Sequence, residues 1–263
     1  MPRFAANLTL MFTEYPFLDR FAAAADAGFS AVEFLFPYDH PPEAIAARLA
    51  AHGLDLALFN LPPGDWAAGD RGIAALPGRF AEFAEGVETA LRYALATGAM
   101  RLHGMAGLAD RRRPAAAEAY GRALRHAAGR LAEHGLDLLI EPINRRSMPG
   151  YFLDDLDAAA DLVMALRAEG HANLRLQFDI YHCQVLHGDV SMRLARHLPL
   201  VGHVQVASVP ARTEPGTGEL NDAFVFAELD RLGYAGFVGC EYNPRAGTEA
   251  GLGWFAPYRD AVP

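Results

Sequence analysis

Oxygen-bearing side chains end four successive apolar segments in the second half of the chain. Glu141 directly follows the apolar run 138–140, and Asp179, Gln205 and Glu241 stand at the ends of later runs. A carboxylate buried at a strand end costs free energy unless a partner or a cation compensates its charge. Taken singly, an acidic residue at such a position is more often a helix N-cap or an ion-pair partner. Its repetition over four segments favours a shared site.

The alternation of side chains along a strand places these four residues on comparable faces. Each shares its face with the residue two positions earlier, namely Leu139, Gln177, His203 and Gly239. If that face points into the interior of a sheet closed into a barrel, the three carboxylates lie close together. They then raise one another's pKa unless a cation neutralises them. An all-oxygen set suits Mg²⁺ or Mn²⁺ better than a thiol-rich zinc site does. The pattern predicts a divalent metal held by Glu141, Asp179, Gln205 and Glu241.

The segments that would position these residues follow a strand-then-helix rhythm. Eight short apolar runs, each expected to be a strand, span residues 4–10, 31–36, 54–61, 100–107, 136–144, 174–182, 201–209 and 236–244. Helical patterns lie between them, as in 42–53, 114–135 and 153–167, and a glycine at the end of such a pattern is a usual helix C-cap. Alternation of this kind implies βαβ units and a parallel sheet. Eight units in 263 residues fit a (β/α)₈ TIM barrel better than an open sheet.

Neither a Pro/Gly/Ser-rich linker nor a shift in composition divides the chain, so residues 1–263 are expected to form a single TIM-barrel domain. Chemistry in such a barrel belongs at the C-terminal ends of the strands. Those ends carry further polar residues, namely Glu33, Asn60, His103, Asn144, His182 and His203. The active site is therefore expected at this face of the barrel.

The composition excludes several classes of function. Apolar residues make up 52% and charged residues 21%, enough for a large core, and the net charge of −9 argues against a nucleic-acid surface. The chain has no lysine, which excludes a lysine Schiff base, pyridoxal phosphate and a P-loop. No dinucleotide fingerprint, signal peptide or membrane-length apolar stretch is present, so we expect a soluble cytoplasmic protein without a redox cofactor. The sequence leaves open whether it forms a homo-oligomer.

The segments AVEFLFPYDH (31–40), EPINRRSMPGYFL (141–153), QFDIYHCQ (177–184), GHVQVASVPARTEPGTGEL (202–220) and GCEYNPRAGTEAGLGW (239–254) resemble the hydroxypyruvate isomerase family. That family lies within the wider group of xylose-isomerase-like TIM barrels, and 2-oxo-tetronate isomerase is a close relative with very similar segments. The resemblance implies that the four predicted ligands bind a divalent cation, usually Mg²⁺. It also implies that Glu141 and Glu241 are the proton donor and acceptor, and that His182 and Arg212 hold substrate. The family more often has R-H-E-P where this chain has Arg-Thr-Glu-Pro at 212–215.

The implied reaction interconverts hydroxypyruvate and tartronate semialdehyde, two small hydroxy-oxo acids, by moving a carbonyl one carbon along. One carboxylate removes a proton next to the carbonyl, and the other returns a proton to the neighbouring carbon of the enediolate. A divalent cation would stabilise the developing charge as a Lewis acid. Arg212 is the first choice for pairing with the substrate carboxylate and Arg146 the second. His103 and Asn144 are also expected to contact substrate.

Other functions use similar residues. A 2-oxo-tetronate isomerase or a ketose 3-epimerase would use the same site, although related epimerases have histidine at the position of Gln205. An apurinic-site endonuclease needs a multinuclear zinc cluster and a basic DNA groove, which the charge of −9 opposes. A non-catalytic barrel that binds metal or sugar remains a further alternative. Replacing Glu241 with Gln separates that case, because only an isomerase would lose activity.

Overall fold

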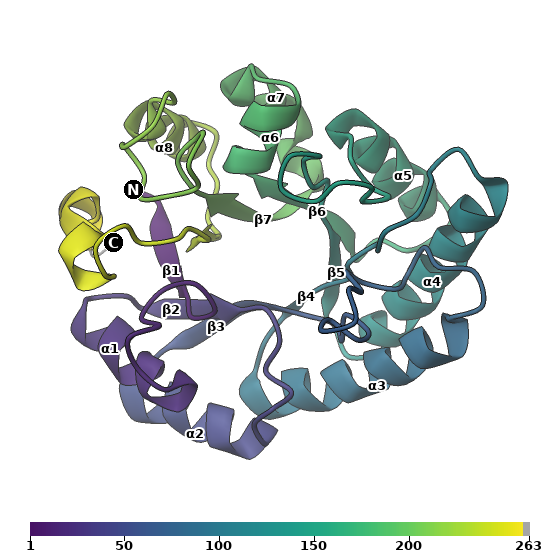
Figure 1. The fold of residues 1–263 in the computed structure, drawn as a ribbon, viewed down its shortest axis with the longest axis horizontal. Helices are drawn as coiled ribbons and strands as arrows, with labels where there is room; N and C mark the ends of the chain where they lie inside the picture. Colours follow the sequence, from purple (N-terminus) through teal and green to yellow (C-terminus); the bar gives the residue numbers. More distant parts are fainter. Residues whose placement is uncertain (260–263) are drawn as a thin grey trace.

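Eight parallel strands close into a barrel in the computed structural model, which describes residues 1–259 (Figure 1). The strands are β1 (Arg3–Asn7), β2 (Ala31–Phe34), β3 (Asp55–Asn60), β4 (Arg101–His103), β5 (Asp137–Ile140), β6 (Leu174–Asp179), β7 (Val201–Val206) and β8 (Phe237–Cys240). Each strand pairs with the next along the chain, and β8 returns to β1, where Phe237 lies opposite Arg3. The predicted (β/α)₈ barrel is confirmed.

Helices surround the barrel and cover the outer faces of its strands (Figure 1). The α-helices are α1 (Arg20–Asp26), α2 (Pro42–His52), α3 (Phe80–Thr97), α4 (Pro114–Ala132), α5 (Leu156–Ala168), α6 (Ile180–Leu186), α7 (Val190–His197), α8 (Asp222–Arg231) and α9 (Ala256–Arg259). Short 3₁₀ helices are η1 (Phe17–Asp19), η2 (Leu198–Leu200) and η3 (Glu249–Trp254). Helix α2 has the expected start and stop residues, since Pro42 occupies its first turn and Gly53 follows its end at φ 62°.

The strands are nearly continuous in apolar sequence because both of their faces are covered. Every residue of β2 and of β8 is buried, as expected for strands between a packed barrel interior and a helical layer. The paired strands are shorter than the apolar runs from which they were predicted. The run 100–107 pairs as a strand only over Arg101–His103, because the chain then turns and Ala106 forms an isolated bridge with Gly72. Strand β5 ends at Ile140, directly before Glu141, which leaves that side chain at the rim of the barrel.

The C-terminal segment packs an aromatic cluster against the first strand. The rings of Trp254, Phe255 and Tyr258 lie 5.1, 5.9 and 5.2 Å from the ring of Phe4, all edge to face. These contacts tie η3 and α9 to the closure point between β1 and β8. Every helix within residues 1–259 is too short or too polar to cross a bilayer.

Candidate active site

A cavity of about 230 Å³ opens at the C-terminal ends of the strands. Its volume lies below the ~300–1,000 Å³ of sites for drug-sized ligands, so it suits a small molecule. Three of the four predicted metal ligands, Glu141, Gln205 and Glu241, line it. The fourth, Asp179, is buried at the end of β6, and its Oδ2 lies 3.9 Å from the Arg212 guanidinium, which also lines the cavity. The structure thus brings all four residues to one face of the barrel.

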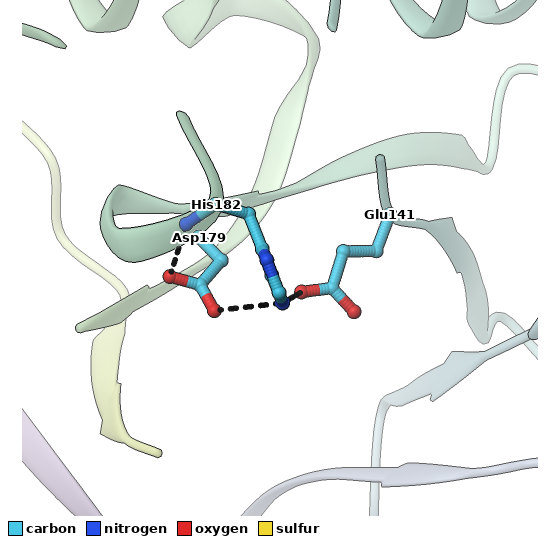
Figure 2. Close-up of side chains that lie close together, drawn as sticks. All are labelled: Glu141, Asp179 and His182. Atoms are coloured by element: carbon cyan, nitrogen blue, oxygen red, sulfur yellow. Dashed lines mark hydrogen bonds and ion pairs between the residues drawn. The ribbon is translucent and has the colours of Figure 1, made fainter. Parts of the chain in front are cut away.

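Glu141, Asp179 and His182 form a cluster in which one possible ligand atom of each lies within 4.8 Å of the others. The Nε2 atom of His182 lies 3.8 Å from Glu141 Oε1 and 3.6 Å from Asp179 Oδ2 (Figure 2). Both of these carboxylate oxygens are buried and have no hydrogen-bond partner among the described residues. Two buried carboxylate oxygens without a donor are costly, and a cation between them would satisfy both.

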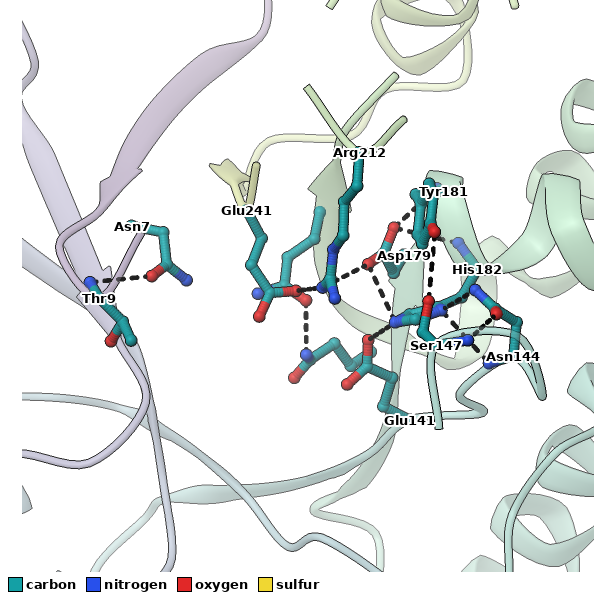
Figure 3. Close-up of polar contacts among 12 residues, drawn as sticks. Asn7, Thr9, Glu141, Asn144, Ser147, Asp179, Tyr181, His182, Arg212 and Glu241 are labelled. Carbon is teal, nitrogen blue, oxygen red and sulfur yellow. Dashed lines mark hydrogen bonds and ion pairs between the residues drawn. The ribbon is translucent and has the colours of Figure 1, made fainter. Parts of the chain in front are cut away.

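Arg212 provides the positive charge of this site from the loop after β7. Its guanidinium donates a 2.7 Å hydrogen bond to Glu241 Oε2, besides its longer contact with Asp179 (Figure 3). The backbone of Arg212 has φ 55°, a left-handed conformation that is uncommon for a residue other than glycine. Its Nε is buried and has no hydrogen-bond partner within residues 1–259, so the guanidinium keeps one unused N–H donor.

The charges of these residues shift their proton affinities. Burial raises the pKa of Glu141 well above its usual range, and the nearby charges of Glu241 and Asp179 raise it further. Burial also raises the pKa of Asp179 and raises that of Glu241 to about 7, in both cases against the opposing charge of Arg212. Burial alone would lower the pKa of Arg212, but the surrounding carboxylates outweigh it and the net shift is upward. Three carboxylates around one arginine leave excess negative charge, which a divalent cation would compensate.

Asn144 determines which nitrogen of His182 carries the proton. The backbone N–H of Asn144 donates to His182 Nδ1 at 3.2 Å, and the side-chain amide lies 2.6 Å from the same nitrogen. Asn144 Oδ1 accepts from the Ser147 backbone N–H, so its NH₂ group must face the ring. Burial lowers the pKa of His182 well below its usual value, which keeps the ring neutral. His182 therefore has its proton on Nε2, and in this tautomer Nε2 is a potential hydrogen-bond donor and not a metal ligand.

Gln205 is oriented by a residue on the opposite side of the barrel. Its Nε2 donates at 2.7 Å to Glu33, and because a carboxylate only accepts, the amide oxygen must point away. That oxygen accepts a 2.6 Å hydrogen bond from Gln177 and keeps a second lone pair for another partner. Glu33 also accepts from Asn7 at 2.9 Å and lies 2.6 Å from His203 Nε2. The amide is thus held so that its oxygen remains a possible ligand.

Gly239 makes room for this network, which gives a testable prediction. A Cβ atom at Gly239 would lie about 2.1 Å from Glu33 Oε2, so Gly239→Ala must displace a buried carboxylate from its donors. We expect a loss of about 2–4 kcal/mol in the free energy of unfolding, measured in urea. Gly129→Ala is the matched control in α4, where a Cβ meets no described atom within 4 Å; it should be neutral or stabilising by up to ~1 kcal/mol. Equal effects of the two changes would refute the steric explanation.

The remaining predicted residues differ in how close they lie to the cavity. His103, at the end of β4, lines it, and its Nδ1 lies 3.8 Å from Glu141 Oε2. Arg146 lies on the exposed rim, where its guanidinium stacks 5.9 Å from the Tyr181 ring and donates weakly to the Pro210 carbonyl at 3.4 Å. It is not among the residues that line the cavity.

Sequence spacing gave no site role to Asn7 or Gln177, because their contacts join positions far apart in the chain.

Comparison with known proteins places this fold in a family. The profile described as "Xylose isomerase-like TIM barrel" matches residues 21–258. The chain belongs to the xylose isomerase-like TIM barrel family. A family relative, 2-oxo-tetronate isomerase from Cupriavidus necator, is 55% identical over 98% of this chain and 99% of that protein. Another, hydroxypyruvate isomerase from Escherichia coli, is 44% identical over 98% of this chain and all of that protein.

A solved structure in the same family matches almost the whole chain. It is described as AP endonuclease, family 2, from Brucella melitensis, with 50% sequence identity, a TM-score of 0.94, and coverage of 99% of this chain and 100% of that one. The names of these two relatives agree on the class of enzyme. The chain is an enzyme of the isomerase class, as the sequence predicted.

Proposed function

We propose that this enzyme moves a carbonyl group between carbons 2 and 3 of a short hydroxy-oxo acid, as in the interconversion of hydroxypyruvate and tartronate semialdehyde. The observation that carries the proposal is the pair Glu141 and Glu241, two buried carboxylates that line one small cavity. Burial raises the pKa of Glu241 to about 7, so in the metal-free site this carboxyl group can exchange a proton near neutral pH. Beside them, Arg212 offers a free donor for the carboxylate of an acid.

The proposed steps balance without a redox cofactor. One glutamate removes a proton from C3 of hydroxypyruvate, and the electron pair moves to form the C2–C3 double bond of an enediolate. The other glutamate delivers a proton to C2, while the hydroxyl proton passes from the oxygen on C3 to the oxygen on C2. His182 presents its Nε2–H beside the carboxylates and can donate to a substrate oxygen. Arg212 pairs with the substrate carboxylate and fixes the orientation of the chain.

A divalent cation, with Mg²⁺ our first choice and Mn²⁺ the second, fits the excess of buried carboxylate oxygen in this site. Glu141, Asp179, Gln205 and Glu241 would hold it. When bound, it supplies a Lewis acid that stabilises negative charge on oxygen. We further propose that the ligand of the cavity is a small molecule, and that neither nucleic acid nor membrane is a partner.

A four-carbon acid is a second candidate substrate. The relative from Cupriavidus necator, at 55% identity, is named 2-oxo-tetronate isomerase, whereas the relative named hydroxypyruvate isomerase is 44% identical. Both names describe acids whose carbonyl can move between C2 and C3. The same glutamates can therefore act on either acid, and the difference between them is a hydroxymethyl group on C3.

The test is an assay of both acids in D₂O, with and without Mg²⁺ or Mn²⁺, followed by proton NMR. We expect isomerisation together with deuterium at the carbon that receives the proton. Absence of interconversion of either acid with both metals would refute the proposal. Isomerisation without any solvent deuterium would instead favour direct hydride transfer over proton transfer by the glutamates.

A further inference from the structure

Two polar side chains on β3 and β4 line the cavity and make no side-chain hydrogen bond within residues 1–259. Asn60 and His103 are paired in register at the ends of these neighbouring strands, so their side chains point to the same side of the sheet. Both line the cavity, and both are buried, with 7% and 1% of their surface exposed. Neither ring nitrogen of His103 has a hydrogen-bond partner within residues 1–259.

The neighbouring strands β1 and β2 show the opposite situation. Asn7 donates to Glu33 and accepts from the Thr9 backbone, and Glu33 receives three donors, so these two side chains are satisfied within the protein. For the Asn60 side chain no such bond is found in the part of the chain that the structure describes. Because buried polar groups in proteins nearly always have hydrogen-bond partners, a ligand is the natural partner of the Asn60–His103 pair.

The barrel order fixes where that ligand atom must lie. In a closed ring of eight strands, β3 and β4 stand across the interior from β7 and β8, which carry Arg212 and Glu241 at their ends. A substrate whose carboxylate pairs with Arg212 has its reacting carbons beside Glu141 and Glu241. Its far end then points toward Asn60 and His103, and His103 is also the neighbour of Glu141 at 3.8 Å.

The chemistry of the pair suits a hydroxyl group. Both ring nitrogens of His103 are buried and lack a hydrogen-bond partner within residues 1–259, and an imidazole ring offers one N–H donor and one acceptor. The amide of Asn60 likewise offers both a donor and an acceptor, and a hydroxyl both donates and accepts. A three-carbon acid ends at its reacting carbon, whereas a four-carbon acid continues into a hydroxymethyl group.

We propose that Asn60 and His103 form a subsite for the hydroxyl on the fourth carbon of a 2-oxo-tetronate, and so select four-carbon over three-carbon acids. The inference rests on the proposed function, which supplies the position of the carboxylate and of the reacting carbons. Asn60 is the specificity-determining residue that can be changed most cleanly, because its side chain makes no hydrogen bond that the described fold needs.

The experiment compares kcat/KM for 2-oxo-tetronate and for hydroxypyruvate in wild type and in Asn60→Leu, with Mg²⁺ present. Leu has a similar size and cannot form hydrogen bonds, so the ratio of tetronate to hydroxypyruvate efficiency should fall about tenfold to a hundredfold. Met164→Leu is the control, since Met164 is half exposed on α5, outside the cavity lining, and the change keeps its volume and apolar character. In that variant the ratio should stay within about threefold of wild type.

Binding of unreactive acids separates the subsite from the proposed reaction. Calorimetric titration with threonate (four carbons) and glycerate (three carbons) should show a preference of wild type for threonate that Asn60→Leu loses. If neither oxo acid is isomerised, the proposed function fails, and this binding preference alone decides the subsite. An unchanged tetronate to hydroxypyruvate ratio in Asn60→Leu, an equal change in Met164→Leu, or the absence of a threonate preference would each overturn the subsite.

Discussion

Glu241→Gln is expected to lower kcat for isomerisation by ~10²–10⁴-fold while the protein stays folded. The amide keeps the shape of the side chain and can still accept a hydrogen bond from Arg212, now 2.7 Å from Glu241 Oε2. It cannot take up or release a proton at the substrate carbon. Steady-state kinetics measures the loss, and circular dichroism with thermal unfolding checks the fold. Glu85→Gln, an exposed change on α3, is the control and should leave kcat unchanged.

Comparison with Glu141→Gln assigns the two glutamates. The variant that lacks the base for hydroxypyruvate should neither isomerise it nor exchange its C3 protons with D₂O. The variant that lacks only the proton donor should still exchange those protons while it forms little product. If both variants retained wild-type kcat, the two carboxylates would not be the proton-transfer groups, and other residues of the cavity would have to move the proton.

The second large effect concerns stability, pH and metal. Burial raises the pKa of Glu241 from 4.5 to about 7, so between these values the folded protein holds a proton that the unfolded chain has lost. Rising pH in this window therefore destabilises the metal-free protein through Glu241. One pKa unit corresponds to ~1.4 kcal/mol, so the full contribution is on the order of 3 kcal/mol. Divalent metal should reverse it, because the cation favours the ionised carboxylates.

The measurement must compare two proteins, because buried histidines act in the opposite direction. Burial lowers the pKa of His103 and of His182, so both add stability as pH rises toward 6.5. We expect the unfolding free energy of Glu241→Gln minus that of wild type, in EDTA, to grow from pH 5 to pH 8. Saturating Mg²⁺ should shrink the difference at pH 8. A difference that is independent of pH and of metal would show that Glu241 is not held in this charged cluster.

The barrel could be predicted because its sequence signals are local. Each strand is a short apolar run, and each adjoining helix has its own start or stop residue, such as Pro42 and Gly53 around α2. Strand ends were predicted too long, as at 100–107, because a run of apolar residues does not reveal where the backbone turns out of the sheet. The alternation of side chains along a strand also predicted that Glu141 and Glu241 point to the same face of the sheet.

The contacts that orient the site could not be predicted in this way. The hydrogen bond from Gln205 to Glu33 joins residues 172 positions apart, and the bond from Arg212 to Glu241 joins the segments that follow β7 and β8. The alternation of side chains predicts which face of the strand a residue takes. It does not predict which of several neighbours its amide or guanidinium will form a hydrogen bond with. The tautomer of His182 depends on a backbone N–H at Asn144, which no residue type encodes.

The order of the strands separates two roles along the chain. The groups proposed for proton transfer, metal binding and carboxylate pairing follow β5 to β8, whereas the Asn60–His103 pair comes from β3 and β4. A chimera that joins the first four βα units of a relative to the last four of this chain should therefore keep this reaction and take its substrate preference from the relative. The two halves meet at the pairs β4–β5 and β8–β1 and through the hydrogen bonds of Glu33 with His203 and Gln205, so these contacts must remain compatible in such an exchange.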